Sequence, residues 1–197
     1  MKLILFCIVL AALRYSHAKL IGSAVIPHGD FVYDPSLVHY ENGSAQLHEA
    51  ATKVGKMITS LNPDIILLST PHGMALTRDF LFYQNTNGSG YALLGQDLHD
   101  PKFPEYKVYL KAKLSPNITT SLVTSLTSRH TNVSGISAWA DSEAQPLRWG
   151  EVIPLTFVRS LLEKDTRLIV ISQPQRRYTE QVAMIPELLQ LGIVLYL

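Results

Sequence analysis

The sequence predicts an α/β fold in which a mostly parallel central sheet carries helices on both faces and places its site at the carboxyl ends of the strands. Apolar runs at 24–26, within a strand expected at 21–26, and at 65–68 each lead into a Pro-His-Gly tripeptide, and an amphipathic segment separates the two. A strand, a helix and a second strand in this order form a βαβ unit with parallel strands. We therefore expect His28 and His72 at one edge of the sheet, where α/β proteins bind ligands.

Residues 1–18 are typical of a secretory signal peptide. Lys2 precedes an apolar run at 3–12, and a small-residue cleavage site follows at 16–18. The run is about half as long as the roughly 20 apolar residues that a membrane-spanning helix needs. The alternatives are a buried N-terminal strand and a short membrane anchor. We expect a secreted, extracellular protein with no stable membrane insertion and a single domain at 19–197.

The composition is that of a globular domain, with 47% hydrophobic and 17% charged residues among 197. Loss of Lys2 and Arg14 with the signal peptide changes the formal net charge from +1 to −1, because 15 basic residues then face 16 acidic ones. This balance gives no electrostatic reason to expect binding to nucleic acid. Cys7, the single cysteine, leaves with the same segment. We expect core packing, without disulfides, to hold the domain together.

Four Asn-x-Ser/Thr sequences agree with passage through the secretory pathway. None has proline in its middle position, and each falls at a predicted loop or at the edge of a predicted element. N-glycosylation is expected at Asn42, Asn87, Asn117 and Asn132.

Hydrophobic periodicity and prolines predict the remaining elements. From 44 to 61 the apolar residues recur three or four apart, which is typical of one helix face, and Pro63 ends that helix. Residues 74–104 are expected to be a long loop excursion. Further strands are expected at 106–114, 133–140 and 167–172, helices at 119–129, 154–162 and 178–191, and one more strand in the apolar tail at 192–197.

Two histidines at matching strand ends suit a divalent metal, because neutral imidazole binds Fe(II) and Zn(II). A third ligand is needed: a carboxylate would complete a non-haem Fe(II) site, and tetrahedral coordination with an open water position would suit catalytic zinc. The alternative for His28 or His72 taken alone is a hydrogen-bonded residue at a strand end.

Three short phrases stand in order along the chain: IPHGD at 26–30, STPHG at 69–73 and LRWGEVIPL at 147–155. They resemble the successive motifs of the class III extradiol ring-cleavage dioxygenases, B-subunit type, whose fold the Memo proteins share. The resemblance covers about 21–191. It implies an oxidoreductase that opens a catechol-type aromatic diol with O₂ through Fe(II), with His28 and His72 in the positions of the iron-binding histidines.

The third phrase departs from the family pattern. Arg148 stands where the family usually has an aspartate, and Trp149 stands where it has the acid/base histidine. An indole donates one hydrogen bond or stacks on a ring, but it does not take a proton near neutral pH. Glu151 is the nearest substitute base, and the alternative is a first-turn carboxylate favoured by the helix dipole.

The second departure from the family pattern concerns the third metal ligand. In the family a carboxylate from a later portion of the chain completes the iron site. We therefore expect this chain to be a C-terminally short member of the family, and the sequence does not indicate whether it is naturally truncated after Gly192. Asp30 is a candidate replacement, against a turn residue that bonds its own backbone. Further candidates are His39, His48, His99 and the pair Arg176-Arg177, each with a solvated surface position as the alternative.

These observations leave more than one function open. The first is an extradiol dioxygenase-like oxidoreductase that takes a small aromatic substrate. The others are a non-catalytic secreted metal- or ligand-binding protein on the same scaffold, with Trp149 as a stacking wall, and an inactive truncated form. The sequence indicates no oligomeric state.

Overall fold

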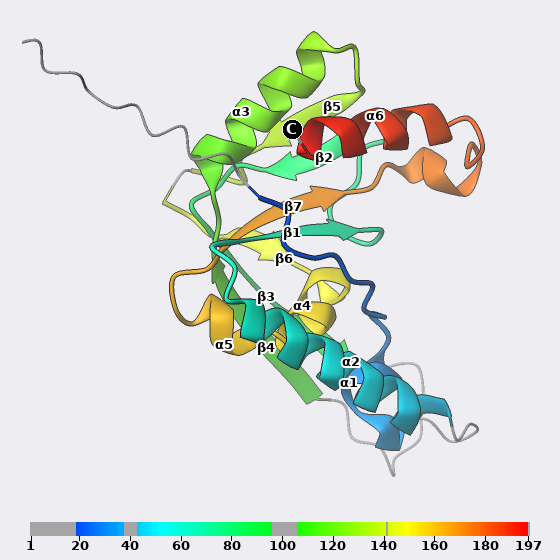
Figure 1. The fold of residues 1–197 in the computed structure, drawn as a ribbon, viewed down its shortest axis with the longest axis vertical. Coiled ribbons are helices and arrows are strands. Elements are labelled where there is room, and N and C mark those ends of the chain that lie inside the picture. The colour runs from blue at the N-terminus through cyan, green and yellow to red at the C-terminus, as the bar shows by residue number, and fades with distance from the viewer. Residues whose placement is uncertain (1–18, 38–42, 96–105, 141, 197) are drawn as a thin grey trace, which may run out of the picture.

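The structure is a computed structural model of the chain, and it describes residues 19–37, 43–95, 106–140 and 142–196 (Figure 1). The predicted signal peptide at 1–18 lies outside the described residues, as do His39, Asn42 and His99. The predictions made for these residues therefore stay predictions.

A four-stranded sheet forms the centre of the molecule. Its strands are β1 (Ile65–Thr70), β7 (Arg167–Ser172), β2 (Phe80–Tyr83) and β5 (Val133–Ile136), in that spatial order. The pairs β1–β7 and β2–β5 are parallel, and β7–β2 is antiparallel. The sheet is thus mostly parallel, which confirms the predicted α/β class. The strand expected at 133–140 ends earlier, at Ile136.

A second, three-stranded sheet has the order β4 (Tyr106–Lys113), β3 (Asn87–Leu94) and β6 (Gln145–Leu147). The prediction of a loop excursion over 74–104 was wrong, because β2 and β3 lie within it. Its glycines serve close strand pairing: β6 runs parallel to β3, and a Cβ on Gly90 would lie 2.9 Å from the backbone nitrogen of Leu147. A glycine-rich stretch can therefore be a strand where another backbone approaches it.

Six helices lie within the described ranges: α1 (Asp30–Tyr33), α2 (Gly43–Leu61), α3 (Pro116–Ser128), α4 (Trp149–Thr156), α5 (Arg159–Leu162) and α6 (Ile185–Tyr196). Short 3₁₀ turns cover Pro35–Leu37 and Gln175–Tyr178. The helices expected at 44–61 and 119–129 are confirmed. Among the described residues, no helix has the length and apolar character needed to cross a membrane.

Two of the helix predictions need correction. The helix expected at 154–162 begins earlier, at Trp149, and breaks into α4 and α5, with Pro154 inside α4. The last helix begins at Ile185 rather than 178 and continues through the apolar tail to Tyr196, so no strand forms there. Gly192 does not end this helix, although glycine lowers helix stability.

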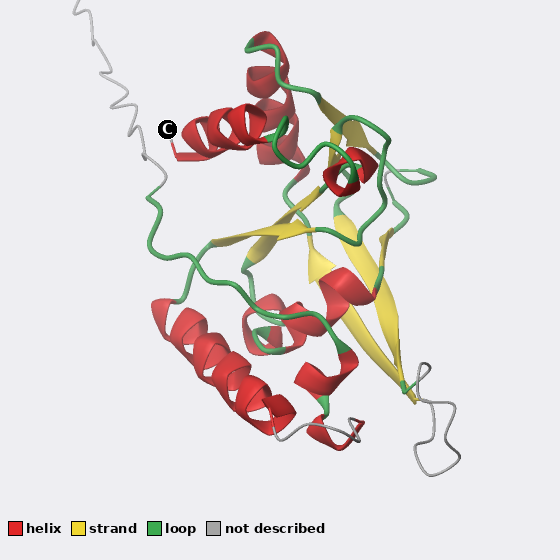
Figure 2. Ribbon diagram, turned by 90° about the vertical axis from the view of Figure 1, so that its right-hand side faces the viewer, coloured by secondary structure: helices red, strands yellow, loops and turns green. Residues whose placement is uncertain are grey.

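The central sheet separates two apolar cores (Figure 2). Leu81, Tyr83, Leu168 and Val170 face a core shared with α4, α5 and the second sheet. Phe80, Phe82, Ile169 and Ile171 face a core with residues of α3 and α6. Successive residues of β2 and of 168–171 in β7 thus alternate between the two cores, which explains why both stretches are continuously apolar.

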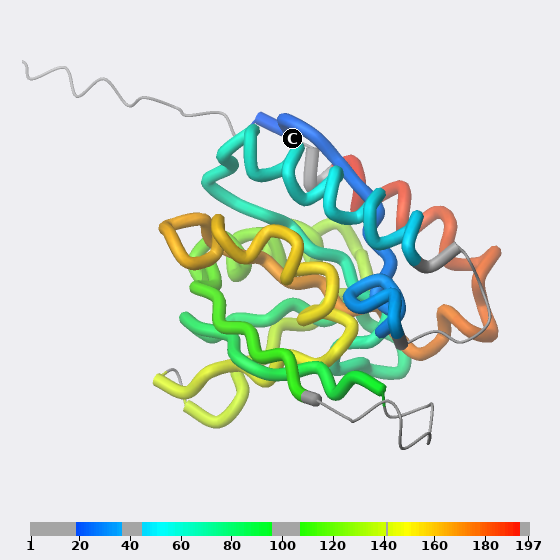
Figure 3. Tube along the Cα trace, turned by 90° about the horizontal axis from the view of Figure 1, so that it is seen from below, coloured from blue at the N-terminus to red at the C-terminus, as the bar shows by residue number. Residues whose placement is uncertain are grey.

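The first expected strand is absent. Residues 19–28, here called the arm, make no backbone hydrogen bond with another described residue, and Val25 is 93% exposed. The arm passes the end of α2, where a Cβ on Gly22 would lie 3.3 Å from Leu61, and continues to α1 (Figure 3). The predicted βαβ unit was therefore wrong, because an apolar run becomes a strand only when it pairs with a neighbour.

Candidate functional site

Three aromatic rings from three separate segments meet at one place. His28 ends the arm, His72 lies in the turn after β1, and Trp149 is the first residue of α4. The ring centroids of the two histidines are 4.8 Å apart, and Trp149 lies 4.4 Å from His72 and 5.0 Å from His28. The indole is stacked on His72, with 28° between the ring planes. The structure thus brings the two histidines together, although the strand expected to carry His28 does not form.

The position of His72 depends on a close approach between the turn after β1 and the start of α4. The Thr70 hydroxyl donates to the carbonyl of Gly150 at 3.2 Å and accepts the backbone N–H of His72 at 3.3 Å. A Cβ on Gly150 would lie 2.7 Å from the Cβ of His72. Only a residue without a side chain fits there, which lets Trp149 stack on His72.

A buried carboxylate, that of Glu151, supports the turn after β1 from the interior of the molecule. Glu151 is fully buried; its Oε2 accepts the backbone N–H of Arg148 at 2.9 Å, and its Oε1 accepts the Tyr83 hydroxyl at 2.8 Å. The Tyr83 oxygen in turn accepts the backbone N–H of Met74 at 2.8 Å. Burial raises the pKa of Glu151 and also that of Tyr83. This geometry is that of the first-turn carboxylate alternative, because both oxygens of Glu151 are engaged in the interior.

The backbone at His28 is anchored by the short helix α1 that follows it, and the His28 ring contacts His72 and Trp149. The side chain of Val32 in α1 is fully buried, and the His48 ring of α2 donates from Nδ1 to the Val32 carbonyl at 2.6 Å. Asp30 accepts the backbone N–H of Gly95 at 2.9 Å. Within the described ranges, no three His, Cys, Asp or Glu residues form a metal-binding group, so Asp30 does not complete a triad with the two histidines.

The electrostatics favour neutral imidazoles. Burial lowers the pKa of His28 below its ordinary value of 6.5. The pKa of His72 is also lowered, first by burial and then by the charges of His28, Arg177 and Arg148. A neutral imidazole keeps a nitrogen lone pair available, which is the form that binds metal ions.

A cleft of about 550 Å³ opens beside His72 and Trp149. Its lining comes from the turn after β1, the start of α4 and the 3₁₀ turn after β7: His72, Gly73, Ala75, Arg148, Trp149, Gln175, Arg177, Tyr178 and Thr179. Sequence reasoning did not assign Arg148 or Tyr178 to a site. The arginine at 148 could have been found, because it precedes the tryptophan that replaces the family histidine.

The pair Arg176-Arg177 divides between the interior and the cleft. Arg176 is buried, forms an ion pair with Glu187 and lies 4.0 Å from Glu180. Arg177 lines the cleft and stacks over the Tyr178 ring, 4.1 Å from its centroid. Only the second of the two arginines is therefore placed to meet a ligand.

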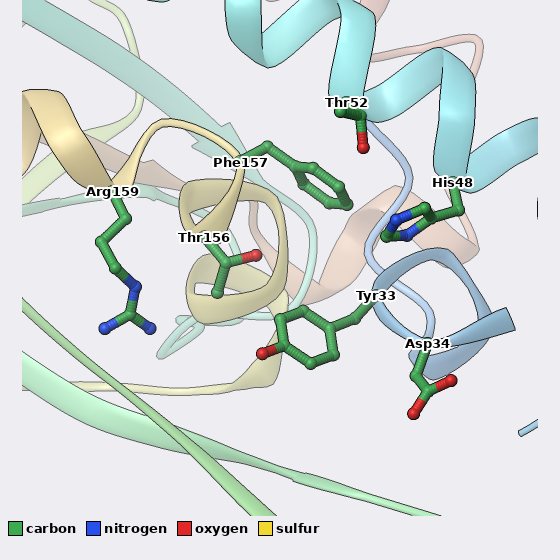
Figure 4. Close-up of a pocket in the computed structure, with 7 residues that line it drawn as sticks. All are labelled: Tyr33, Asp34, His48, Thr52, Thr156, Phe157 and Arg159. Carbon is green, nitrogen blue, oxygen red and sulfur yellow. The ribbon is translucent and has the colours of Figure 1, made fainter. Parts of the chain in front are cut away.

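A second cavity, of about 350 Å³, lies between α1, α2 and the end of α4 (Figure 4). Its lining residues are Tyr33, Asp34, His48, Thr52, Thr156, Phe157 and Arg159. The His48 ring is half-buried here, edge-on to Phe157 at 5.9 Å, rather than on the surface as expected. It does not join the histidine pair.

The glycosylation sequences differ in accessibility. Asn87 at the start of β3 and Asn117 at the start of α3 are exposed. The half-buried side chain of Asn132 donates from Nδ2 to Glu187 of α6, and a glycan on this nitrogen would disrupt that contact.

Neither known protein-family models nor curated proteins match this chain. The resemblance to the extradiol dioxygenases thus stays a prediction, and the case for a function depends on the geometry of the site.

Proposed function

We propose that this chain binds a divalent metal, Fe(II) with Zn(II) as the alternative, through His28 and His72, and receives a small aromatic diol in the adjoining cleft. Its activity would be that of an extradiol dioxygenase-like oxidoreductase. The observation that carries the proposal is the convergence of two imidazoles, 44 positions apart in the chain, beside a cleft.

The spacing of the rings fits a shared ion. Two imidazoles that bind one metal at about 2.1 Å have ring centres roughly 4.5–5 Å apart when the angle at the metal is near 90°. The centroids of His28 and His72 are 4.8 Å apart. In the described part of the chain these residues supply two ligands and no carboxylate. When bound, Fe(II) would bring the diol and O₂ together at its open positions.

The remaining residues of the site bind and orient. Trp149 forms a flat wall on which an aromatic ring can stack, since aromatic pairs gain attraction beyond the area they bury. The buried Glu151 holds the start of α4 in place through Arg148 and Tyr83. Neither group is positioned to exchange a proton with a ligand in the cleft, which is the observation that favours the second candidate, a non-catalytic secreted metal- or ligand-binding protein.

The metal site is tested by metal content. The full chain, produced in a secreting host and incubated with Fe(II) without oxygen or with Zn(II), should retain about one equivalent after desalting, as measured by elemental analysis. The His28→Ala, His72→Ala double variant should retain none. His130→Asn, on the turn after α3, is the matched control and should behave as the wild type. Equal retention by the double variant and the wild type would refute the shared site.

Catalysis is tested by oxygen uptake with a panel of catechols. Uptake by the Fe(II)-loaded wild type supports the oxidoreductase, and binding of a catechol without uptake supports the second candidate. Uptake that appears only in Trp149→His would show that the indole, and not the metal site, prevents turnover.

The proposal includes secretion and glycosylation. The mature chain should be recovered from the culture medium without residues 1–18. Removal of N-glycans should change its mass, and Asn87→Gln and Asn117→Gln should each reduce that change. An unprocessed chain that stays inside the cell would contradict secretion.

A further inference from the structure

We infer that the cleft beside the histidine pair recognises a carboxylate, so that its aromatic ligand is an anion. The inference depends on the proposed function for the aromatic part of the ligand. The anionic part is argued from the cleft itself.

The charged side chains that line the cleft are positive. Arg148 and Arg177 line it, and none of the described Asp or Glu residues does. The neighbouring Arg176 shows the contrast, because it turns inward and pairs with Glu187. Arg148 is exposed, and its side chain forms no salt bridge within the described residues, although the buried Glu151 is close enough to feel its charge. Two guanidinium groups that line the same concave site favour a negatively charged ligand.

Arg177 is held ready for such a ligand. Its guanidinium donates to the carbonyls of Gln173 at 3.2 Å and Pro174 at 2.7 Å, and to the Tyr178 hydroxyl at 2.7 Å. The buried Nε–H of this side chain has no hydrogen-bond partner in the described part of the chain. An arginine whose orientation is already fixed loses little entropy when it binds a carboxylate.

The arrangement also sets the shape of the ligand. The histidine pair lies beside Trp149, Trp149 lies beside Arg148, and Arg177 lines the same cleft. Both guanidinium groups are near enough to His72 to disfavour a charge on its ring. A diol at the histidines, a ring against the indole and a carboxylate at the arginines would occupy the site in that order. The cleft volume of about 550 Å³ is in the usual range for small-molecule sites.

A matched pair of ligands tests the inference: 3-(3,4-dihydroxyphenyl)propionate and its carboxamide, which differ mainly in charge. Binding to the wild type, measured by titration calorimetry without oxygen, should be about tenfold tighter for the acid, because a hydrogen bond to a charged group exceeds one to a neutral group by this order. Arg177→Gln and Arg148→Gln should each reduce the preference, and the double variant should abolish it. Arg129→Gln, on the turn after α3, is the control and should keep it.

The outcomes separate this inference from the proposed function. Equal affinity of the wild type for acid and amide would overturn the inference, while metal retention by His28 and His72 would still stand. A preference that survives in the double variant would overturn it as well, because the recognising charge would lie elsewhere. Failure of both compounds to bind would overturn both the inference and the aromatic part of the proposed function. Loss of metal binding with the acid preference intact would refute the metal site alone.

Discussion

His72 and His28 meet at one site but are held in opposite ways. His72 follows a strand paired along its whole length with β7, and the turn that carries it contacts the buried Glu151–Tyr83 pair and Gly150. His28 follows an arm with no backbone hydrogen bonds to other described residues, and its support comes from α1 and from ring contacts with His72 and Trp149. The His72 side of the site is thus part of the core structure, whereas the His28 side packs on its surface.

This difference indicates how the site could respond to a ligand. Few buried contacts and no ladder hydrogen bonds are the features of a segment with low local stability. A metal bound by both histidines would therefore order the arm more than the core. Its affinity would depend on how well α1 packs against the rest of the molecule.

The largest effect is expected from adding a methyl group under the His72 turn. A Cβ at Gly73 would lie 2.5 Å from the Tyr83 hydroxyl and 2.7 Å from the Ser172 hydroxyl. Gly73→Ala should lower the free energy of unfolding by about 2–4 kcal/mol, through overpacking and loss of buried hydrogen bonds, as measured by urea denaturation. Gly192→Ala has nothing within 4 Å and should raise it by about 0.5–1 kcal/mol. Similar changes in the two variants would contradict a tightly built turn.

A smaller effect is expected on the His28 side from Val32→Ala. Removal of two buried methyl groups should lower the free energy of unfolding by about 2 kcal/mol and reduce metal affinity a few-fold, although neither imidazole is touched. Val182→Ala, at a side chain that is 79% exposed, should change stability by less than about 0.5 kcal/mol. Unchanged metal affinity in Val32→Ala would show that α1 does not position His28.

The buried carboxylate predicts a pH dependence on the His72 side. Because burial raises the pKa of Glu151 above its ordinary value of 4.5, the folded state holds the proton more tightly than the unfolded state. This group should therefore reduce stability as pH rises from 4.5 through the raised pKa, with a slope of at most about 1.4 kcal/mol per pH unit.

Glu151→Gln isolates this contribution, because the amide does not titrate while the two histidines still do. The difference in unfolding free energy between wild type and variant, measured by denaturation at a series of pH values, should change in favour of the variant as pH rises. A difference that stays constant with pH would contradict the assignment.

The last prediction needs no substitution and is tested by hydrogen exchange on the wild type. Amides of residues 20–26 should exchange on the order of a thousandfold faster than those of β7, which pairs on both sides. Addition of Zn(II) should slow exchange near His28 and leave β7 unchanged. Protection of the arm equal to that of β7 would show that it is a strand after all.

Local patterns predicted much of the fold. The spacing of apolar residues in α2 and the unbroken apolar run of β7 each identify an element without reference to its neighbours. The segment at 21–26, with its apolar run at 24–26, was also predicted as a strand, yet it remains unpaired, because pairing depends on residues distant in sequence. The glycines of β3 led to the opposite error, because they predicted a loop where a strand forms. The reason for these glycines is the close approach of β6, which the local sequence does not indicate.

His28 and His72 meet as predicted, although the βαβ unit from which their meeting was predicted does not form. Their support was not predictable, because the bond between Tyr83 and Glu151 joins residues 68 positions apart. Nor did the sequence distinguish Arg176 from Arg177, which are adjacent in the chain. The 3₁₀ turn directs one of them into the core and the other to the cleft.

Because successive residues of β2 face different cores, the register of this strand decides which side chains enter each core. Phe80, Leu81, Phe82 and Tyr83 are apolar enough to fit either face, and a slip of one position would exchange the contents of the two cores. The Tyr83 hydroxyl distinguishes the two alignments. In the native one it meets Glu151 and Met74, and in the slipped one it would be buried without a partner in the core of Phe80 and Leu126. The atom that supports the His72 turn therefore also specifies strand alignment at the centre of the molecule.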